Sequence, residues 1–139
     1  MRRALKRIMQ WMLRATVSTM TQTAGGRYAY QQLLQAGLHM HNTIYHGATS
    51  IVLSTPNALC QYRAKSFSTK EPETLSWLDA IPEGSVFWDV GANVGLYSIY
   101  AAKKNRVTVF AFEPSVFNLE FLARNIFLND LQVHKIKLL

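Results

Sequence analysis

Residues 86–95, with the sequence VFWDVGANVG, decide the fold of this chain. The first five form an apolar run with one acid near its end, which is typical of a strand buried in a parallel sheet. Gly91 and Gly95 follow within four positions of each other, and a helical apolar pattern begins at Leu96. The stretch therefore predicts a strand, a sharp turn and a helix in immediate succession.

The residues that follow repeat this alternation of strands and helices. We expect a helix over residues 96–104, a strand over 107–112, a helix that Ser115 caps and Asn129-Asp130 ends, and a third strand over 134–139. Because the order is β-α-β-α-β, it predicts an α/β fold with a parallel, right-handed, doubly wound sheet.

The turn after the first strand has the features of a nucleotide-type cofactor site. Ligands of such sheets bind at the carboxyl ends of the strands, where glycines let the backbone approach them closely. The start of the next helix offers amide donors to an anionic group. Glu113 ends the neighbouring strand, where a carboxylate suits ribose hydroxyls. The alternative is a purely structural turn at Gly91 and Gly95.

The turn does not match the dinucleotide fingerprint G-x-G-x-x-G. Asn93 stands where a further close glycine is expected, and Asp89 directly precedes the turn. These differences disfavour an NAD-dependent oxidoreductase.

Residues 89–98 (DVGANVGLYS) and 110–114 (FAFEP) resemble the FkbM-type methyltransferase family. Segments 69–75 and 118–129 resemble flanking signatures of that family, so the resemblance covers the chain from about Ile51 onward. It implies a class I Rossmann-like methyltransferase fold, S-adenosylmethionine as cofactor, and O-methylation of a hydroxyl on a sugar or other small molecule. It also implies that Asp89, Gly91, Asn93 and Gly95 cradle the methionine part of the cofactor and that Glu113 holds the ribose. Ala92 and Pro114 complete the expected cofactor-binding set.

The resemblance breaks off in the third strand of the fold. The sheet typical of this fold has the strand order 3-2-1-4-5-7-6. The sequence predicts strands 1, 2 and 3 of that sheet, and strand 4 and the later strands are expected to be missing. We therefore expect a truncated methyltransferase domain that is inactive alone, because the acceptor pocket and any general base belong to later strands. No catalytic residue can be named. The predicted organisation is a basic, mostly helical extension (1–47), a hairpin and helix (48–84), and the N-terminal half of the domain (85–139).

The N-terminal extension carries the positive charge of the chain. The formal net charge is +7, and no acidic residue precedes Glu71. Residues 1–20 predict an amphipathic helix, since apolar residues recur at helical spacing among arginines and lysines. Three interpretations stay open: a basic face packed on the protein, a peripheral membrane contact, or an organelle-targeting segment. The alternative function is accordingly a non-catalytic binding or membrane-surface protein that retains a degenerate Rossmann-like half.

The middle of the chain gives weaker signals. We expect a break at Gly25-Gly26, a helix over residues 28–38, a hairpin between 51–53 and 59–64, and a helix that Ser68 or Thr69 caps and that reaches residue 78. Three nearby histidines lack carboxylate or thiolate companions, so no metal site is expected.

The remaining composition limits the function classes. Cys60 is the single cysteine, which excludes an internal disulfide, and no apolar run is long enough to cross a membrane. We expect a small-molecule acceptor, no nucleic-acid partner and a cytoplasmic location. The oligomeric state is left open.

Overall fold

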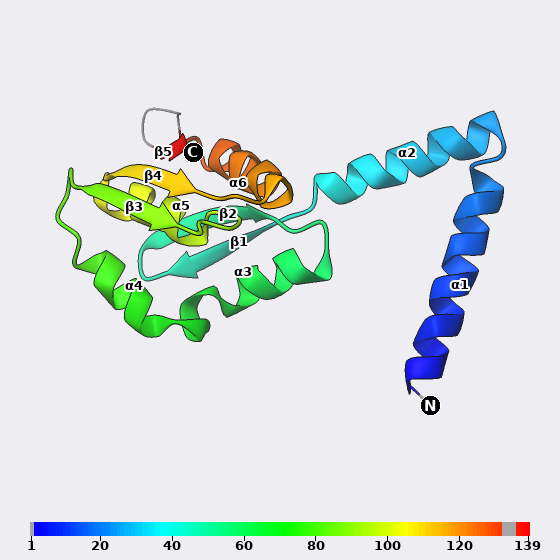
Figure 1. Cartoon of the computed structure of the whole chain (residues 1–139), viewed down its shortest axis with the longest axis horizontal. Helices are drawn as coiled ribbons and strands as arrows, with labels where there is room; N and C mark the ends of the chain where they lie inside the picture. Colours follow the sequence, from blue (N-terminus) through cyan, green and yellow to red (C-terminus); the bar gives the residue numbers. More distant parts are fainter. Residues whose placement is uncertain (1, 132–135) are drawn as a thin grey trace. The chain divides into compact units, whose positions relative to one another are not determined.

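A computed structural model of the chain describes residues 2–131 and 136–139. These residues fall into two compact units that divide between His39 and Met40. Figure 1 labels the helices and strands of both units.

The first unit contains two helices, α1 (Arg2–Met20) and α2 (Ala24–Leu38). The helix expected over residues 1–20 is confirmed from Arg2 to Met20, and Met1 lies outside the described residues. The break expected at Gly25-Gly26 is wrong, because both glycines lie in the first turn of α2. Thr23 begins that helix, since its Oγ1 accepts a hydrogen bond of 3.0 Å from the amide of Gly26.

The second unit contains the predicted parallel sheet, with the strand order β3-β4-β5 (Figure 1). The strands are β3 (Val86–Val90), β4 (Thr108–Phe112) and β5 (Ile136–Leu138). The connecting helices are α5 (Leu96–Asn105) and α6 (Val116–Leu128). The β-α-β-α-β prediction is therefore confirmed. The first residues of the expected strand 134–139 lie outside the described residues.

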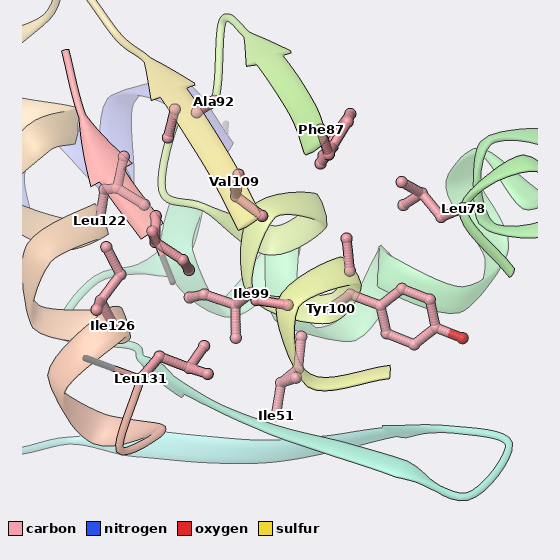
Figure 2. Packing of buried hydrophobic residues seen from close by; sticks show 14 of the residues in the cluster. Ile51, Leu78, Phe87, Ala92, Ile99, Tyr100, Val109, Leu122, Ile126 and Leu131 are labelled. Atoms are coloured by element: carbon pink, nitrogen blue, oxygen red, sulfur yellow. The ribbon is translucent and has the colours of Figure 1, made fainter. Parts of the chain in front are cut away.

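The core of this unit lies on one face of the sheet. Alternate strand residues, among them Phe87, Val109 and Ile136, join a buried cluster with Ile99 of α5 and Leu122 of α6. Figure 2 shows the packing of this cluster. The intervening residues of β3 are exposed, so this strand has one buried and one exposed face.

The predicted hairpin is wrong in its partner. β2 (Thr49–Ser54) pairs antiparallel with β1 (His41–His46), not with residues 59–64. Those residues belong to helix α3 (Ala58–Lys70). The physical reason is the Asn57 side chain, whose Oδ1 accepts a 2.9 Å hydrogen bond from the amide of Cys60 and so begins a helix rather than a turn.

The predicted capping of the next helix is also wrong. Helix α4 (Pro72–Asp79) begins after Glu71, with proline at its first position. Ser68 and Thr69 instead lie in the last turn of α3. At the other predicted cap, Ser115 does begin α6, but its side chain makes no capping hydrogen bond.

Two buried asparagines, Asn125 of α6 and Asn129 directly after that helix, join β2 to the domain. The Asn129 side chain accepts from the amide of Val52 at 2.9 Å and donates to the carbonyl of the same residue at 2.6 Å. The Asn125 side chain accepts from the amide of Ser54 at 2.7 Å and donates to the carbonyl of Val94 at 2.8 Å. These side chains satisfy backbone groups of β2 that would otherwise lack partners.

The described part of the chain holds no helix that is both long and apolar enough to span a membrane. Within that part, no three histidine, cysteine or acidic side chains gather as metal ligands. One of the three histidines, His46, packs edge-on against the rings of Phe67 and Tyr100.

Candidate functional site

A cavity of about 430 Å³ lies at the carboxyl end of β3. One wall is residues 91–94 and the start of α5, and the other is α3 together with Glu71. Doubly wound sheets bind ligands at this end of their strands. Of the expected cofactor residues, Gly91, Ala92 and Asn93 line this cavity.

The loop after β3 is held in place by the end of β4. The amides of Gly91 and Ala92 both donate to the carbonyl of Phe112, at 2.9 and 3.0 Å. The amide of Asn93 donates to Oε2 of Glu113 at 2.8 Å. Because three consecutive amides are bonded to the last residue of β4 and to the side chain that follows it, the loop is a preformed part of the cavity wall.

The two glycines of the turn have different physical roles. Both adopt left-handed backbone angles, with φ of +87° at Gly91 and +84° at Gly95. A Cβ at Gly91 would meet no atom within 4 Å, whereas a Cβ at Gly95 would lie 2.2 Å from Cδ1 of Leu122. The packing of α5 on α6 therefore requires Gly95, and Gly91 leaves open space beside the cavity.

Asn93 carries an unsatisfied acceptor at this site. Its φ of +55° is left-handed, a conformation that asparagine tolerates better than most residues. Its side-chain Oδ1 is buried and has no hydrogen-bond partner among the described residues. Buried polar atoms without partners are rare in folded proteins, so this oxygen is suited to a donor group on a ligand.

Asp89 supports the site from behind the cavity. Its Oδ2 accepts a 2.5 Å hydrogen bond from the Ser98 hydroxyl of α5. Burial raises the pKa of the Asp89 carboxyl, and the hydrogen bonds from Ser98 act in the opposite direction. In the described structure Asp89 does not line the cavity, so its visible role is to fix the start of α5 against β3.

Glu113 connects the loop to the start of α6. Its carboxylate accepts hydrogen bonds from the amides of Ser115 and Asn93, both at 2.8 Å, and from Nδ2 of Asn118 at 3.3 Å. Glu113 is 7% exposed. The hydrogen bonds to its carboxylate, above all the one from the amide of Ser115, hold the pKa of this carboxyl below its usual range. A carboxylate offers about four acceptor positions, so about one stays available to a ligand.

Gly95, Glu113 and Pro114 do not belong to the cavity lining that the described residues form. Pro114 is exposed, next to the buried Glu113. The structure thus brings three of the seven expected residues to the cavity and places the other four around the loop that shapes it.

The family resemblance also implied that Glu71 and Glu73 lie near the mouth of the pocket, and of these two Glu71 lines the cavity. Sequence reasoning missed the wall that α3 supplies. Arg63 and Phe67 of α3 line the cavity, as do Glu71 and Tyr97. The Tyr97 hydroxyl donates to Oε2 of Glu71 at 2.9 Å, and Nζ of Lys70 lies 3.2 Å from Oε1. The bond from Tyr97 is the main cause that lowers the pKa of Glu71. Recognition of Asn57 as a helix cap was the one local signal that could have placed α3 here.

No protein-family model matches the chain. The chain is 39% identical over 51 residues to "Methyltransferase sdnD" from Sordaria araneosa, a match that covers 36% of this chain and 20% of that protein. The matched stretch therefore spans about a fifth of that relative's length.

Solved structures extend the comparison to the fold. The TYW2 structure of M. jannaschii in complex with AdoMet matches with a TM-score of 0.51 and 20% identity, over 71% of this chain and 42% of the other. The M. jannaschii tRNA m1G37 methyltransferase matches with a TM-score of 0.50 and 23% identity, over 71% and 28%. The second unit thus has the fold of part of the class I, Rossmann-like methyltransferases.

Proposed function

We propose that the second unit binds S-adenosylmethionine in the cavity at the end of β3, as the cofactor-binding part of a methyltransferase. The observation that carries this proposal is the loop of residues 91–93, in which Gly91 leaves open space and Asn93 presents an unpaired buried acceptor. These features fit a ligand that approaches the backbone closely and donates hydrogen bonds.

The comparisons support the same cofactor. The curated relative is a methyltransferase, and one of the fold neighbours was solved with AdoMet. Gly91 and Asn93, expected on the methionine side, line the cavity together with Ala92 of the expected cofactor-binding set. Asp89 and Gly95, also expected on the methionine side, shape the turn. Glu113 and Pro114 stand at the end of β4, on the side where we place the ribose.

The residues of the cavity position the cofactor and take no part in bond formation. When bound, S-adenosylmethionine supplies a methyl group already activated on a sulfonium, so the protein mainly aligns the acceptor and excludes water. We propose O-methylation of a sugar or other small-molecule hydroxyl by an FkbM-type enzyme, on the strength of the motifs at 89–98 and 110–114. That the 139-residue chain alone is inactive stays a prediction, which turnover detected by mass spectrometry would contradict.

Isothermal titration calorimetry of the full chain tests the cofactor proposal. We expect heat of binding with S-adenosylmethionine and S-adenosylhomocysteine, and none with NAD at the same concentration. Asn93→Ala should weaken binding, because it removes the unpaired buried acceptor of a residue that lines the cavity. Asn42→Ala, in strand β1 outside the cavity lining, is the control variant. Equal binding of NAD, or no adenosyl binding by the folded chain, would refute the proposal.

We also propose that α1 makes a peripheral contact with anionic membranes. Leu5, Ile8, Met9 and Met12 recur at helical spacing, and Arg3, Arg7 and Arg14 follow the opposite side of the helix. No residue from 3 to 39 is buried, so within this unit nothing covers the apolar side. A helix with an apolar side and a basic side lies in the membrane interface and is attracted to negatively charged lipid.

Vesicle co-sedimentation of the full chain tests this contact. We expect binding to vesicles with phosphatidylserine, weaker binding to pure phosphatidylcholine, and loss of binding with Ile8→Asn. Gln10→Asn on the polar side is the matched control, because it places the same residue in the same helix. Equal binding of Ile8→Asn and wild type would contradict a membrane role. Salt-sensitive binding of RNA by both would instead contradict the prediction of no nucleic-acid partner.

A further inference from the structure

We infer that Arg63 is the anion-binding residue of this cavity and holds the carboxylate in the methionine part of S-adenosylmethionine. The inference rests on the proposed cofactor and adds the group that recognises its charged end. It concerns a residue outside the glycine loop, on the wall that α3 supplies.

Arg63 has an unusual environment for an arginine. Its side chain is half-buried and lines the cavity, yet it forms no hydrogen bond or salt bridge with any residue that the structure describes. Arginines withdrawn from solvent are normally paired, because an unpaired buried charge is costly. A guanidinium left without a partner at a cavity wall is therefore suited to an anion that enters the cavity.

The neighbouring charges do not satisfy Arg63. Lys70, the other cation of the cavity, is exposed and already contacts Glu71 at 3.2 Å. The carboxylate of Glu113 feels the charge of Arg63, but it accepts its three hydrogen bonds from Asn93, Ser115 and Asn118. Arg63 is thus the cation of the cavity that has no hydrogen-bonded or ion-paired partner among the described residues.

The chemistry of the ligand selects which group Arg63 binds. S-adenosylmethionine carries a sulfonium and an ammonium, both positive, and one carboxylate. A guanidinium would repel the first two and can bind the third with two parallel hydrogen bonds. The ammonium has an acceptor of its own at the cavity, the carboxylate of Glu71, a residue that lines it.

The test compares two ligands that differ only in the carboxylate. S-adenosylmethionine and decarboxylated S-adenosylmethionine are titrated into the 139-residue wild-type chain and its Arg63→Gln variant, with circular dichroism to verify folding. We expect the wild type to prefer S-adenosylmethionine. Arg63→Gln should lower its affinity about 10- to 100-fold, as expected for a charge-assisted hydrogen bond, and leave the decarboxylated ligand unchanged. Lys65→Gln, at an exposed position of the same helix, should change neither affinity.

Each other outcome overturns the inference. If both ligands bind the wild type with equal affinity, or Arg63→Gln lowers both affinities equally, Arg63 does not bind the carboxylate. The cofactor proposal would survive either result. If neither ligand binds the folded wild type, both proposals fail. If inorganic phosphate binds at Arg63 while the two ligands bind alike, the residue is a phosphate site. Should Arg63→Gln not fold, Arg63→Lys replaces it, with a smaller but still selective loss for S-adenosylmethionine.

Discussion

The substitution Gly95→Ala should destabilise this domain more than Gly91→Ala does. Both glycines have left-handed backbone angles, so an alanine at either position carries about 1–2 kcal/mol of backbone strain. Only at Gly95 does the new Cβ also collide with another side chain, 2.2 Å from Cδ1 of Leu122.

The structure gives the size of the difference. Leu122 is 0% exposed, so its side chain cannot relieve the collision by moving into solvent. Overpacking of a core usually costs about 1–3 kcal/mol. The free energy of unfolding should therefore fall by about 2–5 kcal/mol in Gly95→Ala and by about 1–2 kcal/mol in Gly91→Ala.

Urea denaturation of the full chain, followed by circular dichroism, measures these losses. Gly91→Ala is the matched control for backbone strain without a collision. In the double variant Gly95→Ala/Leu122→Ala, the second change removes the colliding atom, so the combined loss should be smaller than the sum of the single losses. Equal losses in the two glycine variants, together with additive losses in the double variant, would refute this explanation of the turn.

Two further variants test other parts of the account. Asn129→Ala should destabilise the domain by about 1–3 kcal/mol for each backbone group of Val52 left unpaired. If the variant is as stable in urea as the wild type, the Asn129 side chain does not stabilise the attachment of β2. Because the pKa of Glu113 is lowered in the folded state, its contribution to stability is present above its ordinary value of 4.5 and is lost as the pH falls through the lowered pKa. Glu113→Gln should therefore show a smaller loss of stability than wild type between neutral and acidic pH, and identical pH profiles would contradict that contribution.

The strand, turn and helix of residues 86–105 were predictable from sequence because each element is encoded locally. The apolar run, the glycines and the helical spacing are contiguous, and the predicted sheet order follows from their alternation. The sequence also predicted Gly91, Ala92 and Asn93 as cofactor residues, and all three line the cavity, because the same local pattern places them in the turn. The methyltransferase resemblance added the cofactor, which geometry alone left undecided.

The rest depended on contacts that distant residues make. Asn57 suits a turn and a helix cap equally, so the local pattern did not decide between a hairpin and α3. Arg63 was missed because the fold, and not the sequence neighbourhood, brings α3 to the end of β3. The attachment of β2 to the rest of the domain likewise uses side chains more than seventy positions away, those of Asn125 and Asn129.

The most direct test of the central claim is an amide NMR titration of the full chain with S-adenosylhomocysteine. We predict that the resonances of residues 91–97, and of α3 residues near Arg63, shift as the ligand binds, while those of α1 do not. Unchanged spectra at high ligand concentration, or shifts confined to residues outside the cavity, would contradict a cofactor site at the end of β3.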